Sequence, residues 1–184
     1  MSDHTVIGLR AAIKSLKDVV SPAVDASNPL AVEQLRMVCG FLSMVCDRLP
    51  LRSERVRFDL RNAIELGEAL AGCAAKCDRE AVSHLDKALQ RGVSLMKDPD
   101  AVETDIQSAT AHLSAATSAL IRTSSAIDDA TRRQIDRAVA ANAKTWLDVQ
   151  RAWFQPLGFD TEAETLPSLA VALASTTSNE KAPS

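Results

Sequence analysis

The recurrence of apolar residues at steps of three and four positions is the feature that most constrains the fold of this chain. The first series is the simplest, and its members are Val6, Leu9, Ile13, Leu16 and Val20. The same spacing returns from Leu35 to Leu49 and from Val102 to Leu120. Such a period places the apolar residues along one side of an α-helix. No segment alternates with the period of two that is typical of strands.

Local signals at the ends of these series predict where the helices begin and end. Asn28 is a favourable N-cap, and Pro29 suits the first helical position. Pro50 is expected to end the second helix, and Asp78 to cap the fourth. A looser capping box runs from Ser125 to Asp128 and predicts the start of the last long helix, which reaches about residue 154.

These helices predict an all-α fold, an up-and-down antiparallel bundle of five to six helices. The chain has 184 residues, of which 46% are hydrophobic and 24% are charged, which suits a single globular domain. We expect residues 1–160 to form the helical bundle domain. Residues 161–184 are expected to form a short helix followed by a disordered polar tail.

The N-terminus and the cysteines indicate the compartment. Met1–His4 has no basic segment and no apolar segment follows, so we expect no secretory signal and a cytoplasmic location. No apolar stretch reaches the ~20 residues of a membrane span, so no membrane contact is expected. The four cysteines are expected to be buried reduced thiols. The alternative is a redox or metal role for Cys73 and Cys77.

Several catalytic chemistries lack their motifs. The six glycines are dispersed, which excludes a phosphate-binding glycine loop or a dinucleotide fingerprint. There is no zinc-protease or serine-hydrolase motif, and there are only three histidines. We therefore expect no catalytic residues, no metal and no cofactor. The sequence favours a non-catalytic protein over an enzyme, although helical bundles can bind cofactors without local motifs.

Arginines are dense around the predicted turn between the second and third helices. The cluster consists of Arg48, Arg52, Arg55, Arg57 and Arg61. Guanidinium groups gathered in this way can bind a phosphate or an acidic surface. The alternative is a solvated face with local ion pairs, since Asp47, Glu54 and Asp59 are interleaved.

Aromatic residues are scarce but concentrate near the end of the last long helix. Trp153, Phe154 and Phe159 surround Leu157 at a predicted helix stop. Together with Phe41 on the apolar second helix, these residues are candidates for partner contact. The alternative for the segment at 153–159 is that it closes the open end of the bundle.

Two histidines and one asparagine have alternative interpretations. His84 precedes Lys87 by one helical turn, and this segment resembles the His-x-x-Lys pattern of histidine-phosphotransfer domains. The resemblance implies a phosphorylated surface histidine with a lysine beside it, although Asp86 departs from the pattern of that family. Asn142 lies on an apolar seam, where it either fixes the register or contacts a ligand. The same two interpretations hold for His112.

The leading hypothesis is a non-catalytic helical interaction module, such as an accessory subunit, adaptor or chaperone-like protein. It would contact a protein partner or a second copy through apolar helix faces. The second hypothesis is a bundle that binds a phosphorylated small molecule, with or without catalysis, at the Arg48–Arg61 cluster. The third is phosphotransfer through His84. A net charge of −3 disfavours nucleic-acid binding.

Overall fold

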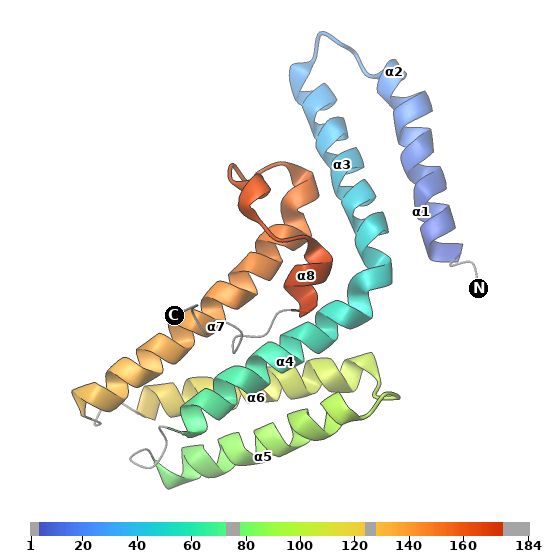
Figure 1. The fold of residues 1–184 in the computed structure, drawn as a ribbon. Coiled ribbons are helices and arrows are strands. Elements are labelled where there is room, and N and C mark those ends of the chain that lie inside the picture. Colours follow the sequence, from blue (N-terminus) through green and yellow to red (C-terminus); the bar gives the residue numbers. More distant parts are fainter. Residues whose placement is uncertain (1–3, 73–77, 124–127, 175–184) are drawn as a thin grey trace. The chain divides into compact units, whose positions relative to one another are not determined.

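The structure is a computed structural model that describes residues 4–72, 78–123 and 128–174, and within these ranges it is helical without strands (Figure 1). The fold is an all-α helical bundle, as predicted. The elements are α1 (His4–Ser15), the π-helical turn η1 (Leu16–Val20), α2 (Ser21–Ala23), α3 (Pro29–Arg48), η2 (Leu49–Leu51), α4 (Arg52–Ala71), α5 (Arg79–Lys97), α6 (Glu103–Thr123), α7 (Asp129–Phe154), η5 (Gln155–Leu157), η6 (Ala163–Thr165) and α8 (Leu169–Ala174).

The predicted N-caps of two helices are confirmed. The Asn28 side chain accepts a hydrogen bond of 3.1 Å from the backbone N–H of Ala31, and Pro29 is the first residue of α3. The Asp78 carboxylate accepts one of 3.2 Å from Ala81 at the start of α5. These bonds satisfy backbone donors that the first turn of a helix leaves free. The predicted capping residue Ser125 lies outside the described residues.

The predicted helix end at Pro50 is confirmed, since α3 ends at Arg48 and α4 begins at Arg52. The chain passes through η2, a turn of 3-10 helix centred on Pro50, and continues directly into α4. Proline has no backbone N–H to donate, and a short 3-10 turn accommodates this loss between the two helices. The helices α3 and α4 and the turn η2 together form the helical run Pro29–Ala71.

The described chain divides into two compact units. Unit 1 consists of Met1–Arg52 and Arg151–Leu166, and unit 2 consists of Ser53–Gln150 and Pro167–Ser184. The predicted division at residue 160 stays a prediction. The predicted polar tail lies outside the described residues, whereas α8 lies within the predicted short helix.

Unit 2 contains the main hydrophobic core. Its buried members come from α4, α5, α6 and α7, and they are Val56, Leu60, Ile64, Leu70, Ala81, Leu85, Ile106, Ala109, Leu113, Leu120 and Ile135. Four of them, Ile106, Ala109, Leu113 and Leu120, belong to the predicted apolar series from Val102 to Leu120. The packing is close at Gly67, where a Cβ atom would lie 2.8 Å from Cδ2 of Leu89. The spacing of apolar residues therefore predicts which side of α6 enters this core.

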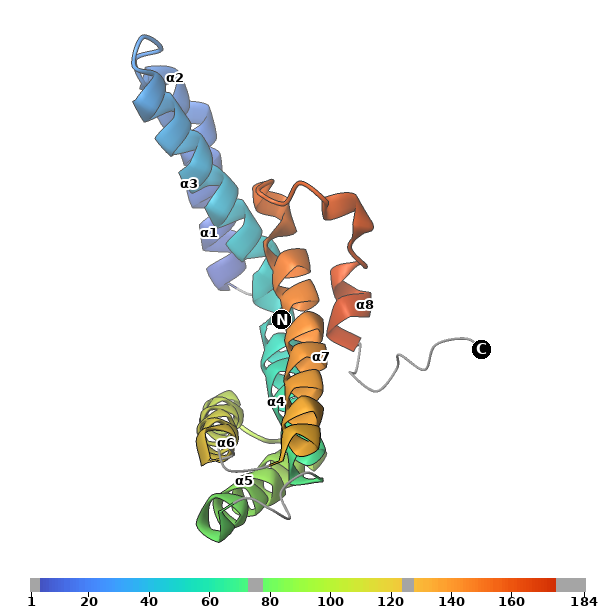
Figure 2. The same ribbon diagram turned by 90° about the vertical axis from the view of Figure 1, so that its left-hand side faces the viewer.

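Unit 1 is built on the pair α1 and α3, which lie side by side (Figures 1 and 2). The side of α3 that carries Cys39 and Cys46 is buried, and the Sγ atom of Cys46 lies 3.9 Å from the backbone oxygen of Val6 in α1. Both thiols are buried, as predicted. Cys73 and Cys77 lie outside the described residues.

The helical run Pro29–Ala71 is long and apolar enough to cross a membrane by length and composition. It has 43 residues, and an 18-residue window within it has a mean hydropathy of 1.3 with 17% of that window buried. A core helix of a soluble protein passes the same test of length and composition. The expected absence of membrane contact therefore stays a prediction.

Candidate functional site

A line of exposed apolar side chains runs along α3 in unit 1. We define the apolar face of α3 as Leu30, Met37, Val38 and Phe41, all of which are exposed; Leu30 retains 68% and Phe41 50% of their accessible surface. Residues 30, 37 and 41 follow the spacing of one helix side, which lies opposite to the buried side that carries Cys39. The wide apolar arc of this helix therefore has one covered side and one uncovered side.

The helix side that carries the apolar face of α3 extends to Met44, which is buried. Met44 follows Met37 by seven residues and Phe41 by three, so it belongs to the same side of α3, but it is only 3% exposed. The 3-10 turn η5, which follows α7, contacts α3 within unit 1. One end of this side of α3 is thus buried in the unit, while the end with Leu30 and Phe41 is open to solvent.

The predicted aromatic segment also belongs to unit 1. Trp153 is half-buried, and the guanidinium of Arg48 lies over its ring at 5.8 Å from the centroid. Leu157 is half-buried, whereas Phe154 is exposed and Phe159 is 73% exposed. The segment therefore contributes both to the packing of unit 1 and to its exposed apolar surface.

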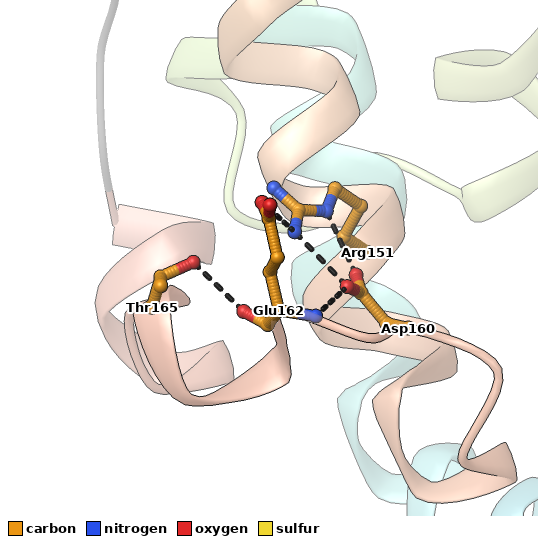
Figure 3. A network of polar contacts seen from close by, with 4 residues as sticks. All are labelled: Arg151, Asp160, Glu162 and Thr165. Atoms are coloured by element: carbon orange, nitrogen blue, oxygen red, sulfur yellow. Dashed lines mark hydrogen bonds and ion pairs between the residues drawn. The ribbon is translucent and has the colours of Figure 1, made fainter.

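A polar network fixes the chain that follows α7 (Figure 3). Arg151 donates two hydrogen bonds to the Asp160 carboxylate, from Nε at 2.7 Å and from Nη2 at 3.0 Å. The same carboxylate accepts a bond of 3.0 Å from the backbone N–H of Glu162, and Thr165 donates to the backbone oxygen of Glu162 at 2.7 Å. Charge-assisted bidentate pairs of this kind are short and directional. The network therefore orders the loop that carries Phe159.

The hydrogen bond from the Arg151 side chain lowers the pKa of the Asp160 carboxyl below its ordinary value. The backbone bond from Glu162 acts in the same direction. Both bonds favour the charged carboxylate, so the network is complete when Asp160 is ionised.

The arginines of the predicted anion-binding cluster make contacts within the protein. Arg48 donates to the backbone oxygens of Ala152 and Trp153 at 3.3 and 3.1 Å. Arg55 binds the Asp59 carboxylate at 3.1 Å. In these contacts the guanidinium groups hold elements of their own unit.

The remaining members of the cluster behave in the same way. Arg57 donates to the backbone oxygens of Asp98 and Pro99 at 3.2 and 3.3 Å. Arg61 donates to the backbone oxygen of Leu173 in α8 and lies over the ring of Phe58. Its buried Nε has no hydrogen-bond partner in the described part of the chain. Arg52 also interacts within the protein. Anion binding by the five arginines stays a prediction.

Asn142 lies on the buried seam, where it pairs with Asn62 of α4. Its Nδ2 donates to the backbone oxygen and to Oδ1 of Asn62 at 2.7 and 3.0 Å, and its Oδ1 accepts from Nδ2 of Asn62 at 3.1 Å. The pair borders a shallow cleft of about 280 Å³, which Trp146 also lines while remaining 44% exposed.

His84 and His112 line one cleft between α5 and α6, together with Lys87 and Arg91. The sequence drew attention to both histidines separately, but nothing in their spacing indicated that they meet. Arg91 was not predicted, although its position four residues after Lys87 places it on the same helix side.

The described residues contain no group of three or more His, Cys, Asp or Glu side chains that could hold a metal ion. The exposed apolar surface of unit 1 and the cleft between α5 and α6 are two candidate binding surfaces in the described residues.

Comparison of the chain with protein-family models, with curated protein sequences and with solved structures found no significant match.

Proposed function

We propose that this protein is a non-catalytic helical interaction module that docks a partner protein or a second copy through unit 1. The observation that carries the proposal is the apolar face of α3, which is exposed along its length. Large exposed apolar patches with a polar surround mark interaction surfaces in folded proteins.

The composition of the face suits a docking surface. It combines a large aromatic side chain, Phe41, with the flexible Met37, and both residue types are enriched in the cores of interfaces. The face lacks charged members, and the charged residues between Leu30 and Phe41, Glu33 and Arg36, form an ion pair of 2.6 Å with each other. A partner that covers this face therefore does not have to desolvate an unpaired charge.

The expected gain from covering the face is substantial. Complete burial of a Leu, Met or Phe side chain contributes about 1.5–3 kcal/mol. These side chains are about half exposed, so each adds about 1 kcal/mol when a partner buries the rest. Phe154 and Phe159 provide further apolar area within the same unit.

The test places a charge on the face and compares it with an equal charge elsewhere in unit 1. Phe41→Glu should abolish association with a partner or a second copy, because a carboxylate in an apolar interface loses its hydration. Ser15→Glu adds the same charge at an exposed position of α1 and should leave association unchanged. Sedimentation across a range of protein concentrations and co-purification of native partners provide the two readouts.

Two results would contradict the proposal. One is a protein that stays monomeric at all concentrations, captures no partner and behaves identically in the Phe41→Glu and Phe159→Glu forms. The other is flotation with lipid vesicles that Phe41→Glu abolishes, which would show that the face contacts a membrane and not a protein.

A further inference from the structure

A cleft between α5 and α6 in unit 2 gathers the two described histidines of this region with two other basic side chains. The two helices run side by side (Figures 1 and 2). The cleft has a volume of about 480 Å³. Its lining consists of His84, Lys87, Ala88, Arg91, His112, Ala115, Ala116 and Ala119.

The sequence of each helix explains why these side chains meet. His84, Lys87 and Arg91 follow one another by three and four positions and so lie on one side of α5. Leu85 of the same helix is fully buried in the core, which fixes the rotation of α5 and keeps the basic side exposed. From α6, His112 reaches the same cleft, and the short alanine side chains leave room for a ligand above the helix surface.

The basic side chains of the cleft differ from the arginines around Pro50 in the contacts that they make. The lining contains no acidic side chain. Within the described part of the chain, no hydrogen bond or ion pair engages Lys87, Arg91 or either histidine. By contrast, four arginines around Pro50 donate to carbonyl or carboxylate oxygens of their own unit, namely Arg48, Arg55, Arg57 and Arg61. The donors of the cleft are therefore available to a bound molecule.

We infer that this cleft is a binding site for a small phosphorylated ligand. Lys87 and Arg91 supply two positive charges, and the arginine fork matches the geometry of phosphate oxygens. Each imidazole adds an N–H donor, and the alanine floor accepts the uncharged part of the ligand. The inference concerns reversible binding and is independent of the docking surface in unit 1.

Inorganic pyrophosphate is the probe for this site, titrated by calorimetry and followed by the imidazole NMR signals of His84 and His112. We expect saturable binding at one site with shifts of both signals. The double variant Lys87→Ala/Arg91→Ala should weaken binding by about tenfold or more, because it removes two charge-assisted contacts. The matched double variant Arg79→Ala/Lys97→Ala removes the same charge from the ends of α5 and should leave the affinity within about twofold.

A second pair of variants tests the shape of the cleft and leaves its charge unchanged. Ala116→Leu fills the floor of the cleft and should weaken pyrophosphate binding, whereas Ala111→Leu adds the same bulk at an exposed position of α6 outside the lining. The inference would be overturned if Lys87→Ala/Arg91→Ala and Arg79→Ala/Lys97→Ala lost the same affinity for pyrophosphate, since diffuse electrostatic attraction would then explain the binding. It would also be overturned by a failure of pyrophosphate to bind, including a case in which a nucleic-acid strand binds while pyrophosphate does not.

Discussion

The two units of this protein use similar apolar helices in opposite ways. In unit 2 the apolar series of α4, α5 and α6 point inward, and Leu60, Leu85 and Leu113 are fully buried. In unit 1 most large apolar side chains of α3 remain exposed, including Leu30 and Phe41. An apolar helix side thus predicts that something covers it, but whether the chain itself does so depends on how many helices the unit contains.

The largest difference between the units is expected from truncation of apolar side chains. Leu113→Ala in unit 2 should lower the free energy of unfolding by about 2–5 kcal/mol, because it leaves a cavity in a packed core. Met37→Ala in unit 1 should change it by no more than about 0.5 kcal/mol, because the side chain is exposed. Urea unfolding of dilute protein measures both.

The same pair of variants sharpens the comparison at high protein concentration. If unit 1 binds a second copy, the cost of Met37→Ala should grow with concentration, since association stabilises the folded state by mass action. Similar losses in the free energy of unfolding for both variants in dilute protein would show that the apolar face of α3 is covered within the monomer, as the apolar helix sides of unit 2 are.

A smaller effect is expected from the buried amide pair of unit 2. Asn142→Leu removes the partner of the Asn62 side chain, and an unsatisfied buried amide costs about 1–3 kcal/mol. The double variant Asn62→Leu/Asn142→Leu should recover part of this loss, since it leaves fewer polar atoms without partners. Chemical unfolding of the two single variants and the double variant gives the coupling. If the losses in the free energy of unfolding of the two single variants sum to the loss of the double variant, the two asparagines do not stabilise the fold as a pair.

The smallest effect is expected from the Arg151–Asp160 contact of unit 1, and it depends on pH. The folded pKa of Asp160 is lowered, so the contact stabilises unit 1 above the ordinary carboxyl value of 3.8, and this contribution is lost as the pH falls through the folded pKa. Asp160→Asn should remove this contribution at neutral pH and so flatten the acid dependence. Amide hydrogen exchange of residues 158–165 at pH 7 and pH 3 measures it. Identical pH dependence in the wild-type protein and Asp160→Asn would assign the effect to another group.

Local features of the fold were predictable because their causes lie within a few residues. Asn28 and Asp78 cap their helices through bonds to the residue three positions ahead, so the sequence contains both partners of each bond. The end of α3 just before Pro50 has a similarly local cause, because a proline has no backbone N–H to donate to a continuing α-helix.

The candidate site was less predictable, because its residues are far apart in the sequence. Asn142 was recognisable as a polar residue on an apolar seam, but its partner Asn62 lies 80 positions away. The arginines around Pro50 formed the densest basic cluster in the sequence, yet their donors go to carbonyl groups such as those of Asp98 and Leu173. The less conspicuous Lys87 and Arg91 face an open cleft with two histidines.

The sequence alone determined that this protein is helical and which side of each helix is apolar, because both properties follow from the spacing of residues along one helix. The tertiary structure decided which apolar sides are covered and which basic side chains lack internal partners. Those outcomes depend on residues from separate helices meeting in space, and the spacing within any single helix carries no information about them.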